Sequence, residues 1–246
     1  MTPDRFPPAT MPQLRRRAFV VASLAAPLLL WGNGARAFPR DPDRTLASVR
    51  GAGRMVVAAS DNPPWVMTGG DDPSGVEVTL VQRFAQMLAV GVDWLRLPAF
   101  EALQAVEQGK ANLAIGGFSR ASVVAQKVAA PTYTYFTERL VVAAPDARSA
   151  PTDLDGQPVY VPPDLVVEQA IRDRGGLPVH DPDSATLIAL PHWRVAAAGM
   201  APTGIELARR EHVLALRRGE NAWLFELEQF LRGQEAAVPD LLEGAR

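Results

Sequence analysis

The stretch LQAVEQGKANLAIGG, Leu103–Gly117, decides the fold of this chain. It begins inside a short helix that we predict over Phe100–Gln108, and Gly109 ends that helix. The apolar run Leu113–Gly116 follows almost at once and is typical of a short buried strand. A helix that leads directly into a buried strand is the repeating unit of α/β proteins.

The residues before this stretch repeat the same pattern. Arg54–Ser60 and Val92–Leu97 are short β-rich apolar runs that predict strands. Between them, Val76–Ala89 places apolar residues at the three- and four-residue spacing of a helix face. Strands and helices that alternate in this order predict a parallel sheet with helices on its faces.

A second, smaller α/β set follows the strand Arg139–Ala144 and the polar break Pro145–Pro151. Arg194–Gly199 fits either a strand or a helix end. In chain order we expect strand Pro158–Val161, helix Asp164–Arg172, strand Pro178–His180, helix Ser184–Leu190, strand His212–Leu216 and helix Ala222–Arg232.

The N-terminal segment has the order of a secretory signal peptide. Arg15–Arg17 precede the apolar run Ala18–Trp31, and Ala35–Ala37 is a small-x-small cleavage site. The run is too short to cross a hydrocarbon core of about 30 Å comfortably. We therefore expect residues 1–37 to be a signal cleaved after Ala37, residues 38–45 to be a linker, and the mature protein to be periplasmic. The alternative is an uncleaved tether.

The sequence Arg16-Arg17-Ala18-Phe19-Val20 resembles the twin-arginine export consensus. That resemblance implies that the protein folds before it is transported. An ordinary Sec signal also begins with positive charge, so the Sec route stays open as the alternative.

Composition excludes several classes of function. The segment before residue 38 carries five Arg and one Asp, so its removal changes the net charge from −2 to −6. An acidic chain is a poor partner for nucleic acid or anionic membranes. The absence of Cys excludes disulfides, thiol catalysis and Cys-ligated metals. The three His, at 180, 192 and 212, lack metal-ligand spacing, so we expect no metal. We also expect no cofactor and no catalytic residue.

Several stretches, in order, resemble family 3 of the bacterial periplasmic solute-binding proteins. They are Gly53–Ala58 with Asp61–Trp65, then Pro73–Val81, Leu103–Gly117, Val128–Tyr135, Asp153–Val159 and Glu211–Gly219. The second half departs from the family pattern, because fewer residues than usual separate Ser184 from the returning strand at His212.

The resemblance implies a two-lobed α/β fold of the type II periplasmic-binding-protein class, with lobes joined by two crossing strands. The first lobe is expected at 46–140 plus 217–246, and a shortened second lobe at 141–216. Such lobes close on a ligand by hinge bending. The implied partners are a small polar solute and an ABC transporter permease, and we expect a monomer.

The ligand of an open α/β sheet lies beyond the carboxyl ends of its strands. This places the loops Asp61–Trp65 and Gly117–Arg120 at the expected cleft. Asp61 and Asn62 either bind a polar ligand group or serve the turn before the prolines. Trp65 either stacks on a ligand or packs on the sheet edge.

Two family residues that grip an α-carboxylate, a Thr and an Arg, fall on Ala121 and Val124 of this chain. Neither side chain can replace a guanidinium fork. Arg120 is the shifted candidate, with Ser119 as a further donor, and the alternative for Arg120 is a solvated surface residue.

Phe118 and Tyr133 either line the cleft or fill the core. Trp193 is expected in the core. Glu138 and Arg139 either form ion pairs across the hinge or bind the ligand. Asp164 is expected to cap the helix that follows it.

The sequence therefore predicts that a small polar solute binds between the lobes. A dehydratase on the same fold, with Glu206 or Asp61 as general acid, is the enzymatic alternative. A sensor or accessory protein not linked to transport is a third possibility.

Overall fold

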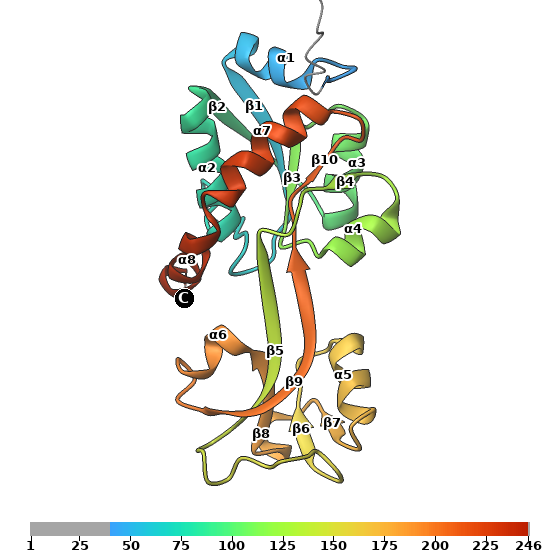
Figure 1. Ribbon diagram of the computed structural model, residues 1–246, viewed down its shortest axis with the longest axis vertical. Coiled ribbons are helices and arrows are strands. Elements are labelled where there is room, and N and C mark those ends of the chain that lie inside the picture. The colour runs from blue at the N-terminus through green and yellow to red at the C-terminus, as the bar shows by residue number, and fades with distance from the viewer. Residues whose placement is uncertain (1–39, 246) are drawn as a thin grey trace, which may run out of the picture. The chain divides into compact units, whose positions relative to one another are not determined.

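The computed structural model describes residues 40–245, which form two five-stranded sheets. The first sheet has the strand order β2-β1-β3-β10-β4, and the second has the order β7-β6-β8-β5-β9. We call each sheet with its covering helices lobe one and lobe two. The α/β fold class and the two-lobed arrangement are as the sequence predicts (Figure 1).

Lobe one contains most of the helices. Its strands are β1 (Arg54–Ala59), β2 (Gly91–Arg96), β3 (Leu113–Ile115), β4 (Ala130–Pro131) and β10 (Ala215–Leu216). Its helices are α1 (Thr45–Ala52), α2 (Val76–Leu88), α3 (Ala99–Glu107), α4 (Arg120–Gln126), α7 (Asn221–Arg232) and α8 (Val238–Gly244), with the 3-10 turn η2 (Glu235–Ala237).

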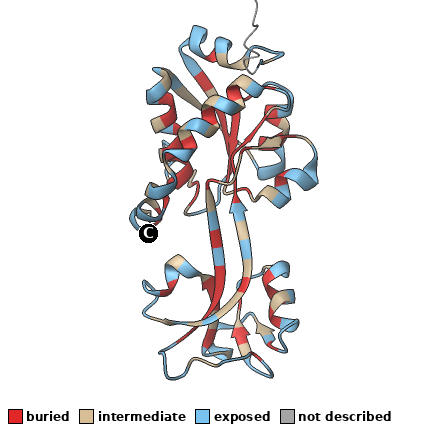
Figure 2. Ribbon diagram, viewed as in Figure 1, coloured by how far each residue is buried: buried red, intermediate tan, exposed pale blue. Residues whose placement is uncertain are grey.

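The alternation of side chains along β1 builds lobe one as three layers. Met55 and Val57 lie in the core beneath α1, α2, α7 and α8, whereas Ala58 faces the smaller core beneath α3. Figure 2 shows that buried residues follow the strands and the inner faces of these helices.

Lobe two is smaller. Its elements are β5 (Phe136–Ala144), β6 (Pro158–Tyr160), α5 (Leu165–Arg172), β7 (Leu177–Val179), the 3-10 turn η1 (Pro182–Ser184), β8 (Leu187–Pro191), α6 (His192–Val195) and β9 (Ala201–His212). The antiparallel pair β5 and β9, which we call the crossing strands, runs from lobe two to the edge of lobe one (Figure 1).

Two predicted elements of lobe two need correction. The helix predicted over Ser184–Leu190 is wrong, because Leu187–Pro191 forms β8, which pairs with both β5 and β6. A short, wholly apolar run does not distinguish a buried strand from a helix by periodicity. The strand expected at His212–Leu216 is divided: β9 ends at His212, and β10 belongs to the other sheet.

The first described residues are held against α7. Asp41 Oδ1 accepts hydrogen bonds from the backbone N–H of Ala222 and Trp223, at 2.6 and 3.0 Å. Glu220 accepts in return from the backbone N–H of Asp43 and Thr45. Asp41 therefore caps α7, because its carboxylate accepts hydrogen bonds from backbone N–H groups at the start of the helix that have no partner within it. It does so from a position distant in sequence.

Replacing Asp41 by Ala is expected to lower the free energy of unfolding by about 1–2 kcal/mol, the usual loss for a cap. Asp43→Ala is the control, because its carboxylate forms only the exposed 2.7 Å pair with Arg217 and should change stability by less than about 0.5 kcal/mol. Urea unfolding followed by circular dichroism measures both, and equal losses would contradict the capping role.

Candidate functional site

A cavity of about 460 Å³ lies between lobe one and lobe two. Lobe one contributes the loops that follow β1 and β3, lobe two contributes the end of β8 and the start of α6, and the crossing strands contribute three side chains. The lining residues are Ser60–Trp65, Ala99, Gly116–Ser119, Ser122, Glu138, Pro191, Trp193, Arg194, Arg210 and His212.

The loop after β1 is shaped by its own hydrogen bonds. Asp61 Oδ1 accepts from the backbone N–H and the hydroxyl of Thr68, at 2.7 and 3.0 Å. Asn62 Nδ2 donates to the carbonyl of Gly116 at 2.9 Å, which joins this loop to the loop after β3. The side chains of Asp61 and Asn62 therefore stabilise the turn before the prolines, which is one of the two roles considered for them from the sequence. Both residues also line the cavity.

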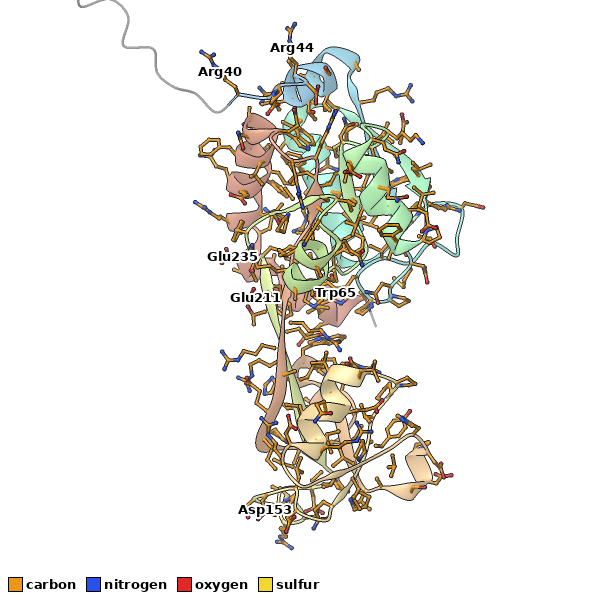
Figure 3. The ribbon with its side chains drawn as sticks, turned by 90° about the vertical axis from the view of Figure 1, so that its right-hand side faces the viewer. Arg40, Arg44, Trp65, Asp153, Glu211 and Glu235 are labelled. Carbon is orange, nitrogen blue, oxygen red and sulfur yellow. The ribbon has the colours of Figure 1, made fainter. Side chains whose placement is uncertain are left out.

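Trp65 is the aromatic wall on the lobe-one side. Only 4 % of it is exposed, and its ring stacks on the His212 imidazole with the ring centroids 3.9 Å apart. Phe136 lies against it at 5.7 Å. Figure 3 shows Trp65 at the edge of lobe one that faces lobe two, whereas Asp153 lies at the far end of lobe two.

The glycine pair that follows β3, Gly116 and Gly117, lets the side chains of Asn62 and Trp65 lie close to the backbone of this loop. Gly117 has φ +62°, and a Cβ atom there would lie 2.5 Å from Asn62 Nδ2 and 2.6 Å from Trp65 Cδ1. The backbone N–H groups of Gly116 and Gly117 donate to Glu77 Oε2 at 2.7 and 2.9 Å. Glu77 is fully buried and fixes this loop from α2 without lining the cavity.

The crossing strands place a cluster of charged groups at the cavity. Glu138, 3 % exposed, accepts from the Trp193 indole N–H at 3.1 Å. Its Oε2 lies 3.6 Å from both Arg210 Nη1 and His212 Nε2. Burial alone would raise the pKa of Glu138, but its neighbours His212, Trp193 and Arg210 outweigh burial and hold the pKa below its usual range.

The remaining predicted residues divide between cavity and framework. Phe118 and Ser119 line the cavity; Phe118 also packs in the core beneath α3, and Ser119 caps α4 by accepting from Ser122 N–H. Tyr133 is not among the lining residues. It packs at the margin of the larger core of lobe one, with the Arg232 guanidinium 5.3 Å from its ring centroid.

Arg120 is also held away from the cavity. Its guanidinium donates to the Thr132 carbonyl at 2.7 Å and the Thr134 hydroxyl at 3.2 Å, and it lies 3.5 Å from Glu211 Oε2. Neither Ala121 nor Val124, the positions at which the resemblance predicted a carboxylate contact, lines the cavity. The lining guanidinium groups are those of Arg194 and Arg210.

Sequence reasoning missed Arg194, Arg210 and His212 as cavity residues and expected Trp193 only in the core. The sequence did contain a sign that Glu138 is buried, because it lies two residues before Leu140 and therefore on the inward face of the same strand.

The predicted helix cap at Asp164 is confirmed: its Oδ1 accepts from Val166 and Val167 N–H. Asp164 also pairs with Arg210.

Within residues 40–245, no group of His, Asp or Glu side chains is arranged to hold a metal ion. No helix in that range combines the length and the apolar character needed to cross a membrane.

Residues 55–237 match the model of the bacterial extracellular solute-binding proteins, family 3. No curated protein sequence matches the chain. Solved structures resemble it at low sequence identity. YckB of Bacillus subtilis is 17 % identical, with a TM-score of 0.68 over 80 % of this chain and 91 % of that one.

Two reconstructed ancestral proteins are similar in the same way. An ancestral cationic amino acid solute-binding protein is 14 % identical, with a TM-score of 0.65 over 81 % of this chain and 98 % of that one. An ancestral cyclohexadienyl dehydratase is 15 % identical, with a TM-score of 0.57 over 78 % and 91 %. At these identities the likeness concerns the fold.

Proposed function

Because the chain belongs to family 3 of the bacterial extracellular solute-binding proteins, we propose that it binds a small polar solute between its lobes and delivers it to an ABC transporter. The observation that carries this proposal is the cavity of about 460 Å³, to which both lobes and both crossing strands contribute. Its lining mixes aromatic faces with hydroxyl, amide and charged groups, as a site for a small polar molecule requires.

Closure about the crossing strands is part of the proposal. Residues 46–140 plus 217–246 would move as one lobe and residues 141–216 as the other, with bending in and beside β5 and β9. A solute that contacts both lobes stabilises the closed arrangement, because it loses the contacts with one lobe when the lobes separate.

Export of the protein to the periplasm is the remaining part of the proposed function. The signal peptide at 1–37, its cleavage after Ala37 and the twin-arginine motif lie outside the described residues, and they stay predictions. N-terminal sequencing of the protein recovered from periplasm tests the cleavage site, and a mature chain that begins at Phe38 is the expected result.

Solute binding is tested by thermal unfolding and small-angle scattering with a panel of amino acids, amines, sugars and organic acids. At a concentration of about 100 Kd, a bound solute should add about 2.7 kcal/mol to stability. The radius of gyration should fall as the lobes close. If no member of the panel changes the unfolding temperature or the scattering, the proposed binding function is wrong.

The enzymatic alternative needs a carboxylic acid that can donate a proton in the cavity. Glu206 does not line the cavity, and its hydrogen bond with Arg209 lowers its pKa. Asp61 is the one predicted acid that lines it. An absorbance assay with cyclohexadienyl acids tests this activity, and binding without turnover is the result that we expect.

A sensory or accessory role differs from transport only in the protein partner. Crosslinking in intact cells followed by purification distinguishes the two, because a transport receptor should recover a permease and a sensory protein should recover a membrane sensor.

A further inference from the structure

The part of the cavity formed by the crossing strands carries a buried imidazole with no hydrogen bond. His212 is 2 % exposed, and neither ring nitrogen has a hydrogen-bond partner among residues 40–245. Glu138 Oε2, at 3.6 Å, is close enough for an ion pair but beyond hydrogen-bond distance. Buried polar groups are almost always hydrogen-bonded, so His212 lines the cavity with unused bonding capacity.

The charges around His212 do not balance. Arg210 lies 3.6 Å from Glu138 and also pairs with Asp164, so two carboxylates share one guanidinium. The carboxylates of this cluster, Glu138 and Asp164, therefore outnumber its guanidinium groups by one. Glu138 is almost wholly buried, and a charge exerts its strongest attraction where water does not screen it.

Other groups at the cavity also accept hydrogen bonds or attract cations. Asn62 uses its amide N–H₂ on the Gly116 carbonyl, which leaves the amide oxygen as its free acceptor. Trp65 and Trp193 contribute indole rings to the lining, and the faces of such rings attract cations.

The matching site for an anion is weak. Of the two guanidinium groups that line the cavity, that of Arg210 already pairs with Glu138 and Asp164. Arg120, outside the lining, is held by Thr132, Thr134 and Glu211. Arg194 is an exposed guanidinium of lobe two, where water weakens its attraction for a carboxylate.

We propose that this cavity recognises its solute through a cationic amine or guanidine held by Glu138 and His212, and that the solute needs no α-carboxylate. The inference rests on the proposed solute-binding function and narrows it to one chemical class. A protonated amine donates to the Glu138 carboxylate and to an unpartnered ring nitrogen of His212, and its charge offsets the second of the two carboxylates that share the Arg210 guanidinium.

The decisive comparison uses the wild-type protein and matched solutes that differ only in the carboxylate. Calorimetric titration compares agmatine with arginine and cadaverine with lysine, and glutarate serves as an anion without an amine. Each amine should bind as tightly as its amino acid within about threefold, or more tightly, because no strong carboxylate site would be lost. Glutarate should not bind.

Several outcomes overturn the inference while the binding function stands. Amino acids that bind more than about tenfold more tightly than their amines would show a carboxylate anchor worth about 1.4 kcal/mol or more. Binding of glutarate, or of neutral solutes alone, would equally contradict a cation site. If no solute of any class binds, the proposed function itself is wrong and the inference is lost with it.

Variants then locate the site. Glu138→Gln should weaken binding of the amine by about 10- to 100-fold, because a charge-assisted hydrogen bond is lost. Glu211→Gln is the matched control, since this acid is exposed, lies next to His212 on β9 and does not line the cavity; it should leave affinity unchanged within about twofold.

Unchanged affinity in Glu138→Gln would overturn the assignment of Glu138. If that variant does not fold, His212→Gln and the wild-type comparison still test the inference. A fall of about 3- to 10-fold is expected for His212→Gln, because the ring nitrogen that accepts from the amine is displaced from its position.

Discussion

Replacing Glu77 by Ala is expected to lower the free energy of unfolding by about 3–5 kcal/mol, which places this substitution among the most damaging single changes. The carboxylate accepts from Gly116 N–H at 2.7 Å, Gly117 N–H at 2.9 Å and the Tyr135 hydroxyl at 2.6 Å. All three donors would lose their partner, and leaving one buried donor unsatisfied costs about 1–3 kcal/mol. Urea unfolding measures the loss.

Glu77→Gln is the matched control. An amide oxygen can still accept from both glycine N–H groups, while the amide N–H₂ can donate to the tyrosine oxygen. A loss below about 1.5 kcal/mol is expected. If the Ala and Gln variants are equally unstable, the hydrogen bonds are not what makes Glu77 important.

The same control tests the pH dependence of stability. Burial raises the pKa of Glu77 above its usual range, against the hydrogen bonds from Gly117, Tyr135 and Gly116 that oppose the rise. The folded protein therefore holds this proton at pH values where the unfolded chain has released it. The resulting stability is present at low pH and is lost as pH rises through the raised pKa. Glu77→Gln should remove this slope.

Replacing Trp65 by Ala is expected to lower the free energy of unfolding by about 3–5 kcal/mol, as for other buried tryptophans. The indole is 4 % exposed and packs on the imidazole of His212, with Phe136 and Tyr135 also around it. Because His212 and Phe136 belong to the crossing strands, the substitution opens the contact between lobe one and those strands. Solute affinity should fall as well, since Trp65 lines the cavity.

Trp65→Phe separates the two effects. It keeps an aromatic ring and should recover about half of the lost stability. Differential scanning calorimetry measures stability, and titration below the unfolding transition measures affinity. A Trp65→Ala variant within about 1 kcal/mol of the wild type would show that the stack on His212 contributes little.

Local sequence patterns were sufficient for the strands β1, β2 and β3 of lobe one and for the helices α2 and α3. Arg54–Ala59 and Leu113–Ile115 are short apolar runs with glycines at their ends, and α2 shows a clear helical face, so the predicted elements agree with the structure within a residue or two. The helix α1 was not predicted. Its short sequence, TLASVRGA, buries only Val49 and shows little of the apolar periodicity that marks a helix.

Lobe two was harder because its longest strand is polar. In β9, exposed and buried positions alternate only weakly, and Arg209, Arg210 and Glu211 follow one another, so the sequence resembles a solvated loop. The strand exists because it pairs along nearly the whole length of β5. Cross-strand pairing of this kind is a tertiary effect that one segment's pattern does not contain.

In the candidate site, too, local sequence patterns predicted some features and tertiary pairing determined others. The loops after β1 and β3 could be placed at the cleft because parallel strands end at a common edge. The pairing of Glu138 with Arg210 and His212 could not, since it depends on the register of two strands that are distant in sequence. For Arg120 the charge suggests a ligand contact, and the sequence pattern does not contain the hydrogen bonds to Thr132 and Thr134 or the pair with Glu211 that the structure shows.

The position of β10 has a consequence for protein synthesis. This strand lies between β3 and β4 in the first sheet, although it follows the whole of lobe two in the chain. The sheet of lobe one therefore keeps a gap between β3 and β4 until Ala215–Leu216 emerge from the ribosome, just after the end of β9 at His212. The N-terminal lobe is the last to mature, and a transport route that requires a folded cargo must wait for α7.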